Sequence, residues 1–356
     1  MTIPRRQISR VLVLLLLLYA AALVFRIDLP TQPAPEQAAQ QAGWYAAYFT
    51  NPQFGAEANL SGGPDEVLAA AIDAADQSVD MAVYELDLWS VRDALARAHS
   101  RGVTVRLVTE SDYLGQAEIQ SLVAAGIQVR GDERDPLMHD KFIIIDGAEV
   151  WTGSMNLTAG SAYRSNNNLL RVRSTWLAEQ YRREFEEMFL LNLFGALSQP
   201  GLSIPASLIE GVQVEVRFSP DDRVAERIVE LIRGAQRSIQ IMAYNLTLDE
   251  ISDAILERAR AGVVVQGVFD AGQAKNQGSD VERLAQAGLG IWLDGSPGLM
   301  HHKVILVDGE LLITGSYNFS RSAEERNDEN VLFIFSPELA DQYRMEFERV
   351  LAEASG

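Results

Sequence analysis

Short runs of hydrophobic residues alternate along this 356-residue chain with longer segments whose hydrophobic positions recur at helical spacing. Apolar runs of about six residues, such as Val103–Val108 and Val263–Phe269, predict buried strands. A helical segment precedes each of these runs and ends at a glycine, Gly102 or Gly262, as helix C-termini often do. Because strands alternate with helices, the pattern predicts a mixed α/β sheet covered on both faces.

The same order of elements occurs twice, which indicates an internal repeat of about 160 residues. One string, H-x-K-x4-D followed six residues later by G-S-x-N, marks the same place in each half. The first copy contains His139, Lys141, Asp146, Ser154 and Asn156. The second copy contains His301, Lys303, Asp308, Ser316 and Asn318. A single H-x-K is weak evidence, but two copies with identical spacing are a specific signal.

The repeat defines the expected organisation of the chain. Residues 44–195 form the first repeat and residues 213–356 form the second, with a glycine- and proline-containing linker at 196–212. Residues 27–43 are rich in proline, glutamine and alanine and are typical of a tether. The leucines and the phenylalanine at the end of the first repeat either pack between the repeats or form a lipid-touching patch, and we favour packing. They are Leu190, Leu191, Leu193, Phe194 and Leu197.

Residues 1–26 are typical of a signal peptide or a signal anchor. Three arginines precede an unbroken apolar run, Val11–Phe25. Fifteen helical residues span roughly 22 Å, which is short of a hydrocarbon core of about 30 Å but suits the central region of a signal peptide. We therefore expect the rest of the chain to be exported, and to be secreted or anchored to the membrane by this segment. Whether the segment is removed stays open.

Charge and composition narrow the chemistry. The formal net charge of −19 argues against broad electrostatic binding to nucleic acid, and against adhesion to anionic lipid by charge alone. A small basic cleft is still compatible with an acidic protein. The chain has no cysteine, which excludes disulfides, thiol catalysis and thiolate metal sites.

The doubled motif has the residue types of an anion site. Alternation along a strand places His139 and Lys141 on one face, so that imidazole and ammonium point together into one pocket. A neutral imidazole can act as nucleophile or as general acid and base, and an ammonium can hold phosphate oxygens. Ser154, Asn156, Ser316 and Asn318 add neutral donors. If the units pack about a pseudo-twofold axis, both sets converge on one phosphorus, and no metal ion is needed.

Other residues of the motif have weaker interpretations. Asp146 and Asp308 belong to the motif, but they have the opposite parity and precede a glycine, so we interpret them as turn formers or hydrogen-bond anchors. His302 occupies the variable position of the motif and is interpreted as incidental. Tyr84 and Tyr244 end equivalent strands, and either pack in the core or line the cleft.

The paired motifs resemble the signature of the phospholipase D superfamily, over about residues 45–355. The resemblance implies two tandem phospholipase D-like repeats, each a mixed β-sheet flanked by helices, packed about a pseudo-twofold axis with one shared active site. It also implies a metal-independent phosphodiesterase or phosphatidyltransferase without a cofactor, acting through a phosphohistidine. His139 would be the nucleophile and His301 the acid and base, with the two lysines and the motif asparagines on phosphate oxygens. Glu329 would be an acidic partner for a histidine; the first copy has Asn167 there.

We therefore expect a phospholipase D-like enzyme that hydrolyses a phospholipid head-group ester at a membrane surface and works as a monomer. The alternatives are a secreted or anchored nuclease of the same superfamily and a phosphatidyltransferase of cardiolipin-synthase type. A non-catalytic binding protein is disfavoured, because both motifs are intact. The sequence leaves open the head group, the choice between hydrolysis and transfer, and which histidine attacks.

Overall fold

The computed structural model describes residues 43–55, 60–198 and 205–355. The expected signal segment at 1–26 lies outside these residues, as does the tether except for Gly43. Within the described part of the chain, no helix combines the length and the apolar character needed to cross a membrane.

The first repeat is built on a mixed sheet. Its strands are β1 (Tyr45–Phe49), β2 (Ser78–Val83), β3 (Thr104–Thr109), β4 (Gln128–Gly131), β5 (Lys141–Ile145), β6 (Glu149–Gly153) and β7 (Asn168–Arg173). Among the described residues the strand order is β1-β7-β6-β5-β2-β3-β4. β2, β3 and β4 are parallel neighbours, whereas β5 runs antiparallel to β2. The motif strand β5 thus lies in the middle of the sheet.

The second repeat has the same topology with one added strand. Its strands are β8 (Ser207–Ile209), β9 (Val212–Ser219), β10 (Ser238–Ala243), β11 (Val264–Phe269), β12 (Gly290–Leu293), β13 (Lys303–Val307), β14 (Leu311–Gly315) and β15 (Glu329–Ile334). Their order in the described residues is β12-β11-β10-β13-β14-β15-β9-β8. β9 takes the place of β1, and β8 extends the edge from within the segment expected to link the repeats.

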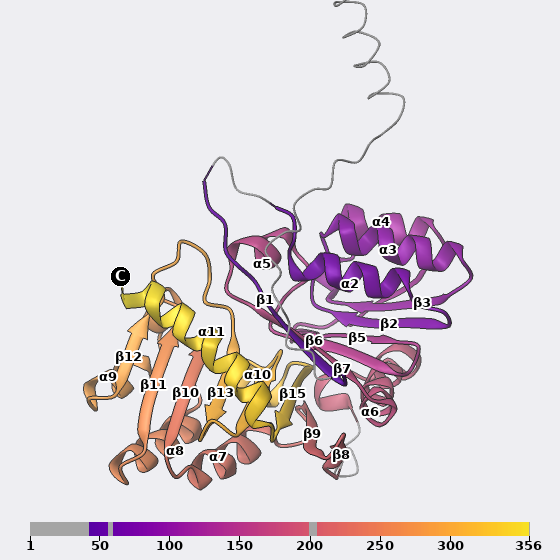
Figure 1. Cartoon of the computed structure of the whole chain (residues 1–356). Helices are drawn as coiled ribbons and strands as arrows, with labels where there is room; N and C mark the ends of the chain where they lie inside the picture. The colour runs from indigo at the N-terminus through magenta and orange to yellow at the C-terminus, as the bar shows by residue number, and fades with distance from the viewer. Residues whose placement is uncertain (1–42, 56–59, 199–204, 356) are drawn as a thin grey trace, which may run out of the picture. The chain divides into compact units, whose positions relative to one another are not determined.

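Helices cover the sheets (Figure 1). In the first repeat they are α2 (Pro64–Asp73), α3 (Trp89–Ser100), α4 (Ala117–Ala124), α5 (Ala159–Arg164) and α6 (Thr175–Glu186). In the second repeat they are α7 (Val224–Gly234), α8 (Asp249–Arg260), α9 (Val281–Gln286), α10 (Arg321–Glu325) and α11 (Pro337–Ser355). Short helical turns are η1 (Ser111–Tyr113), η2 (Glu187–Leu191), η3 (Gly195–Leu197) and η4 (Gln273–Lys275). The predicted α/β architecture is confirmed.

After its first residue, a lysine, each motif strand is apolar because both of its faces are buried. In β5, Ile143 and Ile145 pack in a cluster with α2 and α3, whereas Phe142 and Ile144 face a cluster shared by both repeats. β13 divides its residues in the same way. Strands buried on both faces show such continuous hydrophobic runs rather than alternation. Each fully buried aliphatic or aromatic side chain is worth roughly 1.5–3 kcal/mol of burial free energy.

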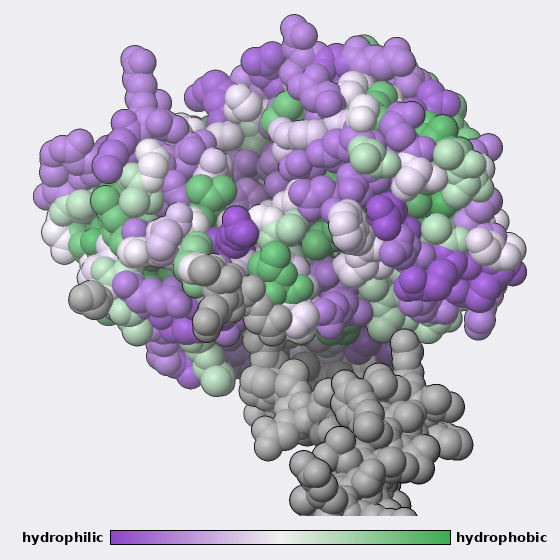
Figure 2. Space-filling view, turned by 90° about the horizontal axis from the view of Figure 1, so that it is seen from above, coloured by the Kyte–Doolittle hydropathy of each residue, from purple (hydrophilic) through white to green (hydrophobic). Residues whose placement is uncertain are grey.

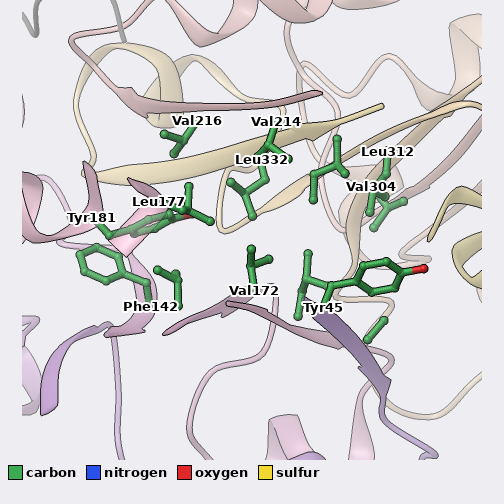
Figure 3. Packing of buried hydrophobic residues seen from close by; sticks show 14 of the residues in the cluster. Tyr45, Phe142, Val172, Leu177, Tyr181, Val214, Val216, Val304, Leu312 and Leu332 are labelled. Carbon is green, nitrogen blue, oxygen red and sulfur yellow. The ribbon is translucent and has the colours of Figure 1, made fainter. Parts of the chain in front are cut away.

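The shared cluster joins the two repeats into one core (Figure 3). Tyr181 of α6 and Phe142 of β5 meet edge to face, with ring centroids 4.9 Å apart, and Tyr181 also contacts Phe218 of β9 at 5.1 Å. Val214 and Val216 of β9 approach from the second repeat. The repeats are therefore joined by packed side chains, which holds their motif strands in a fixed relation.

The leucine-rich end of the first repeat divides between core and surface. Phe194 is buried in the shared cluster, as expected for packing. Leu190, Leu191 and Leu197 are more than half exposed, so the packing expectation is wrong for these three. Elsewhere hydrophilic side chains dominate the face in Figure 2, with apolar side chains in separate small patches. Such a surface agrees with the net charge of −19.

Candidate active site

Each motif histidine is anchored in the opposite repeat. His139 precedes β5, and its backbone N–H donates to the carbonyl oxygen of Asp328 in the second repeat at 3.0 Å. His301 precedes β13, and its N–H donates to the carbonyl oxygen of Asn166 in the first repeat at 2.9 Å. The contact is therefore reciprocal. Both motif loops lie at the junction of the repeats and form one site.

The imidazole rings cross the junction as well. Nδ1 of His139 lies 2.8 Å from a carboxylate oxygen of Glu329. Nδ1 of His301 lies 2.9 Å from Oδ1 of Asn167, the residue equivalent to Glu329. Oδ1 of Asn167 also accepts from the hydroxyl of Ser154, while its Nδ2 donates to a backbone carbonyl, so the orientation of the amide is determined by its neighbours. The amide oxygen can only accept, and His301 must donate from Nδ1.

The Nε2 atoms are the ends of the two rings that face away from these hydrogen bonds. Among the described residues, no hydrogen bond reaches Nε2 of His139 or of His301. A ring nitrogen whose partner nitrogen is oriented by a hydrogen bond is well placed for nucleophilic or acid–base work. About 7% of the surface of each histidine is exposed, so little of either ring is open to solvent.

The motif lysines lie beside the histidines. Nζ of Lys141 donates to the carbonyl oxygen of His139 at 2.8 Å, and Nζ of Lys303 donates to that of His301 at 2.9 Å. An ammonium has three N–H donors, so each keeps further donors for an anion. Burial lowers the pKa of Lys141 to about 8, although Glu329 opposes the shift. Burial, and then the charge of Lys141, lower the pKa of Lys303 well below its usual value.

The electrostatics of the described residues favour neutral imidazoles. Burial lowers the pKa of both histidines well below the usual value, and the charges of the two lysines lower it further. Burial raises the pKa of Glu329 to about 8, while Lys141 opposes the rise. These directions leave one proton shared between Nδ1 of His139 and the Glu329 carboxylate. Two ammonium groups beside two neutral imidazoles form a site that is suited to a phosphodiester.

Tyr84 and Tyr244 line the site, which decides between the two interpretations of these residues. The Tyr84 ring meets the His139 imidazole edge to face at 5.0 Å, and its centroid lies 5.3 Å from Nζ of Lys141. The Tyr244 ring likewise meets the His301 imidazole edge to face, with ring centroids 4.9 Å apart, and its centroid lies 5.2 Å from Nζ of Lys303. Both tyrosines form a wall against histidine and lysine, and the aromatic face stabilises the ammonium.

The motif asparagines and serines occupy different places. Asn156 and Asn318 are half-buried, and the Oδ1 atom of each is buried without a partner among the described residues. Ser154 and Ser316 are fully buried, and their hydroxyls accept the backbone N–H groups of Asn168 and Asn330. The expectation that the serines bind phosphate is therefore corrected. They lie behind the site and hold the strands that carry Asn167 and Glu329.

Asp146 and Asp308 lie at the turns, away from the reacting groups. The Asp146 carboxylate accepts the backbone N–H groups of residues 76, 77 and 78 at 2.7–3.0 Å, and Asp308 accepts those of residues 236, 237 and 238. Burial alone would raise the pKa of each, but these hydrogen bonds bring it below the usual value. Asp146 and Gly147 both have positive φ, 53° and 61°, as a hairpin turn requires.

The residues between the motif histidine and lysine, Asp140 and His302, have structural roles. His302 is fully buried, with Nε2 3.0 Å from Glu346 and Nδ1 3.3 Å from Oδ1 of Asn168 in the other repeat. Asp140, at the equivalent position, accepts from Nδ2 of Asn330 at 2.7 Å. Calling His302 incidental was therefore wrong, because both residues hydrogen-bond across the junction. A polar residue at this place in both copies was the available signal.

The family follows from these features and from direct comparison. The family model described as "Cardiolipin synthase, PLD-like domain" matches residues 68–189 and again residues 228–351. The chain belongs to the phospholipase D superfamily. A phosphatidylserine synthase of Haemophilus influenzae has the same fold across both repeats, with a TM-score of 0.65 over 89% of this chain and 88% of that chain at 12% identity.

Curated members of the superfamily match about one repeat of this chain. A mitochondrial cardiolipin hydrolase of Chlamydomonas reinhardtii is 31% identical over 169 residues, which cover 41% of this chain and 76% of that protein. A phospholipase D of Rickettsia prowazekii is 36% identical over 130 residues, which cover 36% of this chain and 63% of that protein. At family level, this phospholipase D superfamily member is an enzyme of the phosphodiesterase type.

Within the described residues, no group of three or more histidine, aspartate or glutamate side chains is arranged to hold a metal ion. The expectation that the reaction needs no metal stays a prediction.

Proposed function

We propose that this chain hydrolyses the head-group ester of a phospholipid through a covalent phosphohistidine, with no metal ion or other cofactor. The observation that carries the proposal is the crossed pairing of the two histidines. His139 is backed by the carboxylate of Glu329, and His301 is backed by the amide of Asn167, each from the opposite repeat. Two unequal imidazoles beside two ammonium groups suit two-step displacement at one phosphorus.

In the first step, Nε2 of His139 attacks phosphorus and the bond from phosphorus to the head-group oxygen breaks. The imidazole gains positive charge as the N–P bond forms, and the Glu329 carboxylate stabilises that charge through Nδ1–H. The leaving alkoxide takes a proton from Nε2 of His301. His301 takes up that proton from solvent as the substrate binds, because the phosphodiester anion offsets the lysine charges that otherwise lower the His301 pKa.

In the second step, Nε2 of His301 takes a proton from water, and the oxygen of that water attacks phosphorus. The N–P bond breaks, which releases phosphatidic acid and restores His139. Lys141, Lys303, Asn156 and Asn318 hold the non-bridging oxygens through both steps. Loss of one donor of this kind commonly costs about 10²- to 10³-fold in rate.

A phosphatidyltransferase is the second candidate, because the matching family model is described as cardiolipin synthase. The chemistry differs only in the acceptor: an alcohol in place of water would receive the phosphatidyl group from His139. The same residues would serve both reactions, so the products distinguish the two candidates.

The proposed setting is a membrane surface outside the cytoplasm, with the enzyme working as a monomer. The apolar run within residues 1–26 supports export or anchoring. The exposed leucines Leu190, Leu191 and Leu197 offer apolar contacts to lipid. Both histidines and both of their partners come from one chain, which supports a monomer.

A parallel assay tests this function. Purified protein is incubated with phosphatidylcholine, cardiolipin, single-stranded DNA and bis(p-nitrophenyl) phosphate, with and without EDTA. We expect phosphatidic acid from at least one lipid, release of p-nitrophenol, and no effect of EDTA. Cleavage of DNA without cleavage of lipid would instead support the nuclease, and loss of activity in EDTA would reject the metal-free reaction.

A further inference from the structure

The two repeats present different walls beside their histidines. The first wall consists of residues 84–88, which follow β2, and residues 110–116, which follow β3. The second wall consists of the equivalent residues 244–248 and 270–276, which follow β10 and β11. Each wall begins with the tyrosine that contacts its histidine. The backbones correspond, so any preference between the walls comes from the side chains.

The charges of the walls differ. The first wall carries four acidic residues and no lysine or arginine; they are Glu85, Asp87, Glu110 and Asp112. The second wall carries one acidic residue, Asp270, and one basic residue, Lys275. Glu110 and Asp270 are equivalent and buried, and they accept the N–H groups of Met138 and Met300. Without this matched pair, the first wall has three carboxylates and the second has one ammonium.

Glu85 and Asn245 are the equivalent pair that directly follows the two tyrosines of the site. Glu85 follows Tyr84, accepts from Nε2 of Gln116 at 3.0 Å, and is close enough to Lys141 to interact with its charge. Asn245 lies between Tyr244, whose ring contacts His301, and Leu246, which pairs with Phe319. Phe319 follows the motif residue Asn318. Asn245 is therefore the chain neighbour of a residue that contacts His301 and of one that pairs beside the second motif asparagine.

The amide of Asn245 has unused hydrogen-bonding capacity. Its Oδ1 atom is buried without a hydrogen-bond partner in the described part of the chain. Buried polar atoms are normally paired, and a bound group that completes the network is one explanation for an exception. An amide both donates and accepts hydrogen bonds, which matches a hydroxyl group. The quaternary ammonium of choline has no N–H group and neither donates nor accepts, so it is best held by carboxylates or aromatic faces.

In-line displacement decides which wall meets the head group. With His139 attacking from the first repeat, the leaving oxygen lies on the far side of phosphorus, beside His301 and the second wall. The water or alcohol of the second step enters from the same side. The head group therefore leaves along the wall that has an amide and a lysine, not along the wall with the carboxylates.

We propose that Asn245 is a specificity-determining residue, which selects hydroxyl-bearing head groups such as glycerol over ammonium head groups such as choline. This inference rests on the proposed function. The amide exchanges hydrogen bonds with head-group hydroxyls, and Lys275 on the same wall disfavours a cation. Glu85, the equivalent residue on the first wall, does not contact the leaving group and does not set the preference.

The test compares two matched isosteric variants. Initial rates are measured on short-chain phosphatidylglycerol and phosphatidylcholine below their micellar concentrations, so that surface charge plays no part. We expect Asn245→Asp to shift the ratio of rates toward phosphatidylcholine by about tenfold, because a carboxylate attracts the positive charge of choline. Glu85→Gln is expected to leave the ratio within about twofold, even if both rates change together. Release of p-nitrophenol from bis(p-nitrophenyl) phosphate reports whether each variant is folded and reactive.

The outcomes separate this inference from the function on which it rests. A ratio that moves in Glu85→Gln but not in Asn245→Asp would place the head group on the first wall and overturn the inference. A ratio that moves in neither variant would also overturn it, while lipid hydrolysis itself stands. If the wild-type protein cleaves bis(p-nitrophenyl) phosphate but no phospholipid, the proposed function fails first. Asn245→Ser, which keeps a donor and an acceptor, should retain the wild-type preference if Asn245→Asp proves unstable.

Discussion

His139 of the first repeat lies 2.8 Å from Glu329 of the second, whereas His301 of the second repeat faces Asn167 of the first at 2.9 Å. The positions are equivalent, but the chemistry is not. A carboxylate stabilises positive charge on the ring that it contacts, and an amide oxygen mainly fixes the position of a proton. From this difference we expect attack by His139 and proton transfer by His301.

Replacing Glu329 by glutamine should slow the first step. Glu329→Gln keeps the size of the side chain but removes the charge behind His139. We expect kcat to fall by about 10²- to 10⁴-fold with a smaller change in KM, because the charge on the ring develops in the transition state. Steady-state kinetics on bis(p-nitrophenyl) phosphate measure this. Asn167→Asp is the matched control, and in this variant His139 should still be the residue that carries the covalent phosphoryl group of the trapped intermediate. A phosphoryl group found on His301 would contradict the expected roles.

The two alanine variants of the histidines should lose activity at different steps of the reaction. His139→Ala should release no p-nitrophenol, since the nucleophile is absent. His301→Ala should give a burst of about one p-nitrophenol per enzyme and then stall, because p-nitrophenolate leaves without a proton but water lacks its base. Rapid-quench kinetics and mass analysis of the trapped peptide check both results. A burst in His139→Ala and none in His301→Ala would reverse the roles.

As pH rises, kcat/KM should begin to fall at a pH well below that at which an ordinary lysine loses its proton. Burial lowers the pKa of Lys141 to about 8, and that of Lys303 lies well below its usual value. An ammonium holds phosphate oxygens only while protonated, so kcat/KM should decline as pH rises past a midpoint at or below about 8, where an ordinary lysine titrates near 10.4. Replacing each lysine in turn by arginine, which keeps its proton, identifies the lysine responsible. A profile that is flat up to pH 10 would exclude this origin.

The turn aspartates should contribute to stability. Asp146→Ala removes an acceptor for three backbone N–H groups, and we expect a loss of about 1–2 kcal/mol in the free energy of unfolding, since the turn is partly exposed. The folded-state pKa of Asp146 is lowered, so its contribution is present above the unfolded pKa of about 3.9 and is lost as pH falls through the folded value. Urea unfolding at pH 7 and at pH 3 checks this: the difference from wild type should shrink at the lower pH. Asp308→Ala is the matched variant in the second repeat.

Much of the fold was predictable from local pattern. The period-two alternation before and within β5 placed His139 and Lys141 together, and the Asp146-Gly147 dipeptide predicted the hairpin turn that the positive φ angles confirm. The doubled order of strands and helices predicted two equivalent sheets, and the structure has them.

The errors concern what each buried face meets. Alternation shows that His302 lies on the same face as Val304 and Leu306 of β13, but not that this face meets Asn168 of the other repeat. The motif predicted that Ser154 is a donor but could not show that its hydroxyl is engaged by Asn167 and Asn168. Both facts depend on contacts between residues far apart in the chain, which local sequence periodicity does not encode.

The crossed anchoring of the two motif loops also bears on how such a site can evolve. If the halves were separate identical subunits related by a twofold axis, the same residue would stand behind both histidines, and any substitution would appear at both places. Joined in one polypeptide, the halves can mutate independently. Glu329 opposite Asn167, and Asn245 opposite Glu85, are differences that two identical subunits could not hold. Under the proposed mechanism, they let one histidine specialise as the nucleophile and the other as the proton carrier.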